Sequence, residues 1–122
     1  CPVAGWYEGQ SVAPTETYEQ RVAATRKRFI EGIPDRLQAV SDALRETDGA
    51  DPRETKARKV HRMLHDLAGN AAMLEYLEIE DCLRKGLRVA EDADESSSPL
   101  SADDVRIIET ALADANSVVE NI

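Results

Sequence analysis

Residues 101–122 read SADDVRIIETALADANSVVENI and carry the most regular hydrophobic pattern of the chain. The apolar positions follow spacings of three, four, three, four and three: Val105, Ile108, Leu112, Ala115, Val119 and Ile122. Such spacing lines up apolar side chains on one face of an α-helix. Ser101, just before this run, is of a residue type that caps helix N-termini. The stretch therefore predicts an amphipathic C-terminal helix.

Three further helices are predicted upstream of this one. The segment at about 79–94 repeats apolar residues on one side, and Gly86 on that side allows close contact with another helix. The segment from Asp51 to about residue 76 opens with an acid at the N-cap and a proline at the first helical position, as helix starts commonly do. The segment at 34–48 has apolar residues at alternating spacings of four and three.

The N-terminal region divides into a tail and an additional helix. Residues 1–15 contain two prolines and two glycines without a hydrophobic period, which predicts a flexible tail. A helical pattern follows and is interrupted by Gly32 and Pro34. No alternation typical of strands occurs in the sequence. We therefore expect residues 16–122 to form an all-α domain, an antiparallel four-helix bundle with an additional N-terminal helix.

Composition narrows the functional classes. The chain has 122 residues and a formal net charge of −9, which argues against binding to a nucleic-acid backbone. No apolar run approaches the ~20 residues that span a membrane, and no signal-peptide pattern is present. Cys1 and Cys82 do not make a disulfide framework. These features predict a cytoplasmic, monomeric domain without a nucleic-acid or membrane partner.

His65 is the most unusual residue of the helix expected at 51–76. On a helical wheel of ~100° per residue, the apolar residues on the opposite side are Val60, Met63, Leu67 and Leu74. His65 is therefore predicted to point away from the core. Its nearest outer neighbours are Gly69, Ala72 and Ala68, at about 40°, −20° and −60° on the wheel. Their small side chains would leave a clearing in which another protein can approach the imidazole.

The sequence HDLAG at residues 65–69 resembles the motif of the histidine-containing phosphotransfer (HPt) domain of bacterial phosphorelays, a helical His-x-Leu-Lys-Gly. His65, Leu67 and Gly69 match that motif in type and spacing. Two positions depart from it: Ala68 stands in place of the usual lysine, and Glu75 in place of a common glycine. The resemblance extends over the helical pattern from residue 29 to the C-terminus.

The resemblance implies a four-helix bundle that carries a phosphoryl group and is not an enzyme in its own right. His65 would accept the group from an aspartate of a response-regulator receiver domain or from a sensor histidine kinase, and would pass it to a second receiver. The receiver would supply Mg²⁺ and most of the catalysis, so no intrinsic cofactor or metal is expected. A histidine with a pKa near about 6.5 is largely neutral and nucleophilic at cellular pH. The expected docking rim consists of His61, Arg62, Ala68, Gly69 and Ala72.

Two arginines are candidates for the role of the missing lysine. Arg62 and Arg58 lie at ~60° and ~20° from His65 on the wheel. A guanidinium at either position could donate charge-assisted hydrogen bonds to a phosphoryl group on His65. Alternatively, both arginines pair with surface acids such as Glu54 or Asp66. The sequence leaves the two possibilities open.

Two other functions compete with phosphotransfer. The first is a helical adaptor that binds a receiver or kinase without being phosphorylated, which the replacement of the lysine by Ala68 favours. The second is a metal-binding bundle, because His61 and His65 have the spacing of two zinc ligands on one helix face. The zincin motif needs a glutamate after its first histidine, however, and Arg62 occupies that position. No further cluster of cysteines and histidines offers a third ligand.

Overall fold

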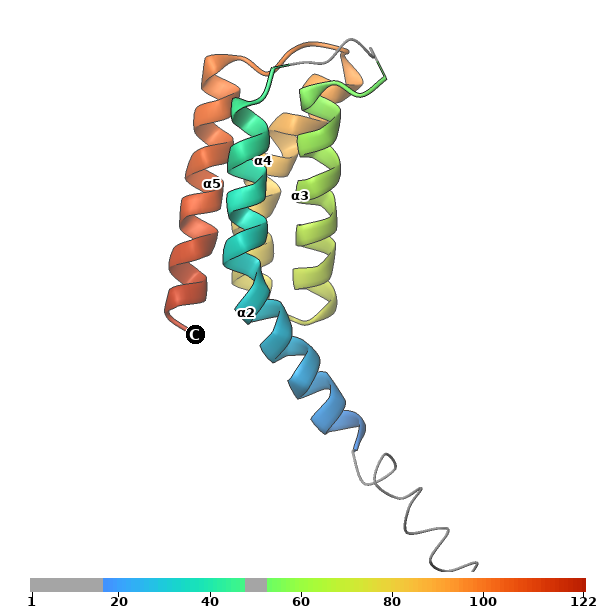
Figure 1. Cartoon of the computed structure of the whole chain (residues 1–122), viewed down its shortest axis with the longest axis vertical. Helices are drawn as coiled ribbons and strands as arrows, with labels where there is room; N and C mark the ends of the chain where they lie inside the picture. Colours follow the sequence, from blue (N-terminus) through green and yellow to red (C-terminus); the bar gives the residue numbers. More distant parts are fainter. Residues whose placement is uncertain (1–16, 48–52) are drawn as a thin grey trace, which may run out of the picture. The chain divides into compact units, whose positions relative to one another are not determined.

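The computed structural model describes residues 17–47 and 53–122, and every regular element in these ranges is an α-helix (Figure 1). The elements are α2 (Tyr18–Arg45), α3 (Lys56–Met73), α4 (Leu77–Glu95) and α5 (Ala102–Glu120). The predicted all-α class is therefore confirmed for the described residues. The tail predicted at 1–15 lies outside them. No helix among the described residues combines the length and the apolar character that crossing a bilayer requires.

The additional N-terminal helix is not a separate element. α2 runs without interruption from Tyr18 to Arg45 and contains Pro34. Proline lacks an N–H group and fits best in the first turn of a helix, which is why the sequence suggested a break there. Pro34 is exposed, so water can satisfy the carbonyl group that its missing N–H leaves unbonded. The chain separates into two compact units, residues 1–31 and 32–122, and α2 contributes to both.

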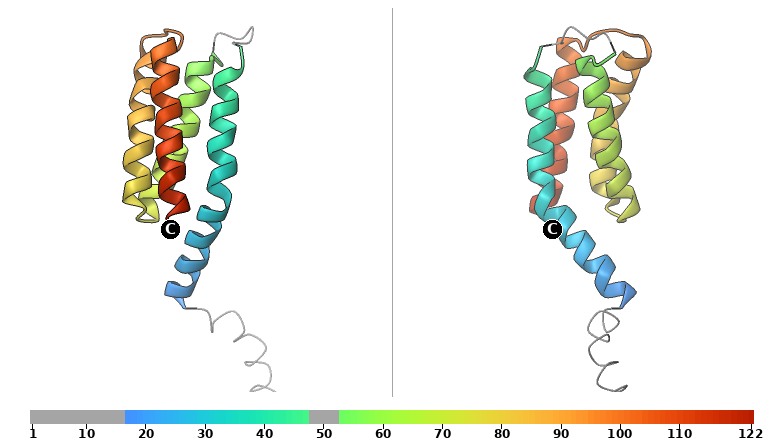
Figure 2. Two further views of the ribbon diagram at one scale, coloured as in Figure 1. Left: turned by 90° about the vertical axis from the view of Figure 1, so that its left-hand side faces the viewer. Right: turned by 45° about the vertical axis from the view of Figure 1, so that its right-hand side comes forward.

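The unit at 32–122 contains the candidate site. Its helices run alongside one another: the C-terminal part of α2, then α3, α4 and α5 (Figure 2). α3 packs against α4, and α4 packs against α5. The largest fully buried side chains of the unit come from all four helices: Ile33, Val40, Val60, Leu64, Leu67, Ile79, Leu83 and Ile108. Burying each such side chain stabilises the fold by roughly 1.5–3 kcal/mol.

The helix starts confirm one capping prediction and correct another. Ser101 and Asp104 form a reciprocal capping box at the start of α5, with N···O distances of 3.0 and 2.9 Å. α3, in contrast, begins at Lys56, with Thr55 as its N-cap. The hydroxyl of Thr55 accepts a hydrogen bond from the backbone N–H of Arg58 at 3.1 Å. The helix start predicted at Asp51 was therefore wrong, and Asp51 itself lies outside the described residues.

Left-handed residues end α3 and α4. Glu75 has a φ of 66° and Ser97 a φ of 54°. The N–H of Tyr76 donates to the carbonyl of Ala71 at 2.8 Å, and the N–H of Ser98 donates to the carbonyl of Ala93 at 2.9 Å. These are the bonds of the Schellman motif, in which the left-handed position favours glycine. The motif at Glu75 turns the chain sharply from α3 into α4.

Gly86 brings α4 and α5 close together. A Cβ built on Gly86 would lie 3.1 Å from Cβ of Ala111 and 3.4 Å from Cα of Ile108. Because both of those atoms are fixed to the backbone of α5, a larger residue would push the helices apart. The prediction that Gly86 permits a close helix contact is confirmed.

Candidate functional site

His65 lies on the exposed side of α3, in the middle of the helix. Its side chain is 70% exposed, and its Nδ1 atom is 4.0 Å from the Oδ1 atom of the equally exposed Asp66. At this distance and exposure, the carboxylate exerts little restraint on the imidazole. The ring nitrogens of His65 are therefore accessible to a partner molecule, in agreement with the predicted orientation.

Gly69 lies one turn further along the same face. A Cβ at this position would meet no heavy atom within 4 Å, so packing within the described part of the chain does not require a glycine here. Glycine in mid-helix costs roughly 1 kcal/mol relative to alanine. Ala72, the next small residue, is half-buried. The open space beside His65 is thus formed mainly by Gly69.

Ala68 does not belong to this open space, and its predicted place on the docking rim was wrong. The residue is 1% exposed and lies in the core. The buried residues of α3 are Ala57, Val60, Leu64, Leu67, Ala68 and Ala71. Their arc is centred near Leu64 and Ala71, which is about 70° away from the centre assumed on the helical wheel. The larger apolar residues alone misplaced that centre, because Ala57, Ala68 and Ala71 are buried as well.

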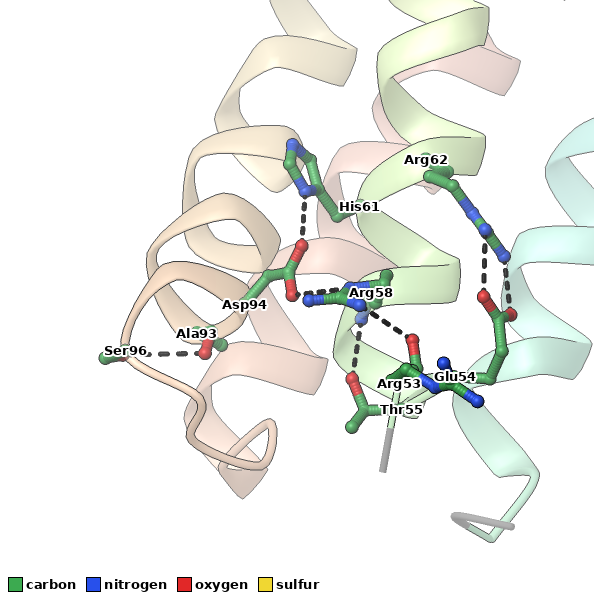
Figure 3. Close-up of polar contacts among 9 residues, drawn as sticks. All are labelled: Arg53, Glu54, Thr55, Arg58, His61, Arg62, Ala93, Asp94 and Ser96. Carbon is green, nitrogen blue, oxygen red and sulfur yellow. Dashed lines mark hydrogen bonds and ion pairs between the residues drawn. The ribbon is translucent and has the colours of Figure 1, made fainter. Parts of the chain in front are cut away.

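His61 is held by an acid from the neighbouring helix (Figure 3). Its Nδ1 atom lies 2.8 Å from Oδ2 of Asp94 on α4, and both side chains are largely buried, with 25% and 16% exposed. The hydrogen bond from His61 and, to a lesser degree, the contact with Arg58 lower the pKa of Asp94 below its ordinary value. Asp94 is therefore an ionised acceptor that links two helices beside His65.

Sequence reasoning gave Asp94 no role, because it lies in the acidic run 91–95. A signal was nevertheless present. Asp94 follows Leu87 by seven residues and Ala90 by four, so it shares the face of α4 that those two residues bury. An acid at such a position needs a partner from another helix.

The two candidate arginines are engaged with acceptors other than His65. Arg62 makes a bidentate pair with Glu54 at 3.0 and 2.7 Å, and this hydrogen bonding raises its pKa above the ordinary value. Arg58 donates from Nε to Asp94 at 3.4 Å and from Nη1 to the carbonyl of Arg53 at 2.8 Å. Glu54 was one of the acids suggested by the sequence, whereas the partners of Arg58 were not foreseen. None of the hydrogen bonds or ion pairs described for these two arginines involves His65.

The two histidines of the chain are neighbours in space. The ring centroids of His61 and His65 are 6.3 Å apart, and the ring planes are perpendicular. Across residues 17–47 and 53–122, no group of three or more histidines, cysteines or acids is arranged to hold a metal ion. The arrangement is thus one exposed imidazole beside one imidazole that is fixed by a carboxylate.

Comparisons with known proteins found no matching family model, no similar curated protein and no similar solved structure. A functional assignment for this chain therefore depends on the chemistry of the surface around His65.

Proposed function

We propose that this chain is a histidine phosphotransfer domain, in which His65 carries a phosphoryl group between an aspartate of one receiver domain and that of another. The observation that carries this proposal is the exposed imidazole of His65 beside the open position at Gly69, on a helix that packs against α4. An exposed nucleophile on a regular helix is accessible to a protein partner yet fixed in position. The sequence pattern at residues 65–69 and the all-helical fold are consistent with this role.

The transfer needs little from the chain itself. A neutral nitrogen of His65 attacks phosphorus in line with the bond to the donor aspartate. The N–P bond forms as the P–O bond breaks, and the aspartate carboxylate leaves with the electron pair. The single proton of the imidazole stays on its other nitrogen. The receiver supplies the Mg²⁺ that neutralises charge on the phosphoryl oxygens, so this monomeric carrier has no cofactor of its own.

The acceptor surface for a receiver includes His61, Arg62, Gly69 and Ala72. Arg62 is half exposed in its pair with Glu54. Exposed ion pairs contribute little to stability, so Arg62 can exchange Glu54 for a phosphoryl group at small cost. That Arg62 or Arg58 meets the charge of phospho-His65 stays a prediction. Replacing both arginines with alanine should slow phosphotransfer, and an unchanged rate would contradict it.

The competing function is that of an adaptor that binds a receiver or kinase without being phosphorylated. The observations in its favour are the burial of Ala68 at the position of the usual lysine and the engagement of both arginines with other acceptors. On these grounds, the chain would keep the docking surface and lack the cation that stabilises phosphohistidine. The two functions differ in one measurable property, which is covalent labelling of His65.

The test is phosphorylation of the purified chain by a panel of phosphorylated receivers and sensor kinases. We expect an acid-labile, alkali-stable label that disappears in His65→Gln. Because the chain has only two histidines, His61→Gln is the matched control and should keep a label. Asp66→Asn controls for a change of charge next to the reactive residue. Receiver binding without any label would contradict phosphotransfer and support the adaptor.

A further inference from the structure

We propose that His61 is a positioning residue for the phosphoryl group, with Asp94 fixing its Nδ1 atom so that its Nε2 atom serves as a hydrogen-bond donor to a phosphoryl group on His65. This inference rests on the proposed function and names a further residue, besides Arg62 and Arg58, for the role of the missing lysine. Its basis is the chain of contacts from Asp94 to His61 and from His61 to His65.

The first contact fixes the ring of His61. The Nδ1···Oδ2 distance of 2.8 Å is that of a charge-assisted hydrogen bond. The carboxylate of Asp94 is itself held by Arg58 and is an acceptor only, so Nδ1 of His61 must carry the proton. A histidine bound in this way has a defined tautomer and ring orientation, as metal-binding histidines do when a carboxylate supports them.

The second contact places the ring of His61 next to that of His65. In Figure 3 the second ring nitrogen of His61 lies on the side of the ring away from Asp94. His65 follows His61 by four residues, one turn along the same face, and its ring is perpendicular to that of His61 at 6.3 Å between centroids. A phosphoryl group extends beyond the ring that carries it, so on His65 it would come within reach of a ring one turn away on the same face.

The charge around His61 suits this role once His65 is phosphorylated. Its ring contacts Asp94 from α4 and lies beside His65 of α3, and Arg58 binds the other oxygen of Asp94. A phosphoryl group adds a charge of about −2 near neutral pH. The protonated form of an imidazole donates from both nitrogens. With Asp94 on Nδ1, the imidazolium form of His61 has its Nε2–H left to donate to the phosphoryl group.

Two amide substitutions separate this role from a purely structural one. The side-chain nitrogen of asparagine can occupy the place of Nδ1, so His61→Asn keeps the contact with Asp94 and removes the distal donor. The nitrogen of glutamine reaches the place of Nε2, so His61→Gln keeps the distal donor and removes the contact with Asp94. Asp94→Asn completes the set, since it removes the charge that fixes the ring.

The measurements are the fraction of label that His65 takes from a limiting phosphorylated receiver, the ³¹P shift of phospho-His65 against pH, and the midpoint of thermal unfolding. We expect His61→Asn to lower the equilibrium for transfer to His65 on the order of tenfold, as one charge-assisted hydrogen bond would. We expect His61→Gln to keep most of the transfer despite a lower midpoint. A His61→Asn variant that transfers like the parent, with His61→Gln impaired, would overturn the proposal and leave His61 a link between α3 and α4.

A chemical donor distinguishes failure of this inference from failure of the proposed function. Phosphoramidate transfers its phosphoryl group to exposed imidazoles without a receiver. If no receiver or kinase labels the chain, but the ³¹P titration of chemically made phospho-His65 changes in His61→Asn, the relay function is wrong and the contact with His61 stands. If receivers label His65 and that titration is the same in the parent and in His61→Asn, the relay stands and the role of His61 is wrong.

Discussion

Asp94 of α4 accepts a hydrogen bond from Nδ1 of His61 on α3 at 2.8 Å, with both side chains largely buried. The pair joins the helix that carries His65 to its neighbour, at a point one turn before His65. The pair fixes the relative register of α3 and α4 in a way that apolar packing alone does not.

Asp94 should make the stability of the fold dependent on acid pH. Because its pKa is lowered in the folded state, its contribution is fully present above the unfolded value of about 3.9 and is lost as pH falls through the lower folded value. We expect Asp94→Asn to be less stable than the parent at pH 7 and to approach it below about pH 4. Urea unfolding across this range measures the difference, with the exposed Asp66→Asn as control. A constant difference at all pH values would contradict the assignment.

Restoring the family's lysine should not restore a phosphate-binding cation. Ala68 is in the core, so Ala68→Lys must bury an ammonium group or displace α4. We expect a loss of stability of about 2 kcal/mol or more and no gain in transfer to His65. Ala72→Lys, at a half-buried position on the face of His65, is the matched control and should unfold close to the parent. Thermal unfolding and labelling are measured together, and a stable, faster Ala68→Lys would contradict the description of the core.

Replacing Gly86 and Gly69 with alanine should affect stability differently. Alanine gains roughly 1 kcal/mol of helix propensity at either position. At Gly69 nothing opposes this gain, so Gly69→Ala should be more stable than the parent. At Gly86 the new Cβ meets Ala111 at 3.1 Å, and overpacking of this kind costs about 1–3 kcal/mol. Chemical unfolding should therefore rank Gly69→Ala above the parent and Gly86→Ala below Gly69→Ala. Equal stability of the two variants would show that α4 and α5 separate freely.

Replacing the left-handed residues that follow α3 and α4 with glycine should stabilise the fold. Glu75 and Ser97 adopt φ values of 66° and 54°, where a side chain costs roughly 1–2 kcal/mol. Glycine removes this cost and loses part of the gain to greater freedom of the unfolded chain. We expect Glu75→Gly and Ser97→Gly each to stabilise the fold by about 0.5–1 kcal/mol. Glu78→Gly, on the exposed face of α4, should instead destabilise it. Lower unfolding midpoints for the first two variants would refute the prediction.

The sequence predicted those features that depend on local chemistry. Hydrophobic period identified the helices at 79–94 and 101–122, and the capping residue Ser101 followed from its type and place. The exposure of His65 was also predictable, because a long apolar arc occupies the other side of its helix. Period alone does not reveal that Pro34 lies within one helix, since its exposure depends on what the helix packs against.

The errors in the candidate site have a common physical origin. Small residues such as Ala68 carry no strong preference for water or core, so their place depends on which side of α3 the neighbouring helix covers. The partner of an acid such as Asp94 lies 33 positions earlier in the chain, and no local pattern encodes that distance. The apolar residues of a helix locate the centre of its buried face only to within one row of side chains. An error of one row moves Ala68 from the predicted docking rim into the core.

The last turn of α4 carries charges of the sign that the helix dipole disfavours. The C-terminal end of a helix dipole is negative, and this one bears Glu91, Asp92, Asp94 and Glu95 with no basic residue of its own in the last turn. Arg58 and His61 of α3 offset part of this negative charge, because both contact the carboxylate of Asp94. An isolated peptide of α4 would consequently fray at this end. In the folded chain the last turn of α4 is held from α3, so its stability depends on the helix that carries His65.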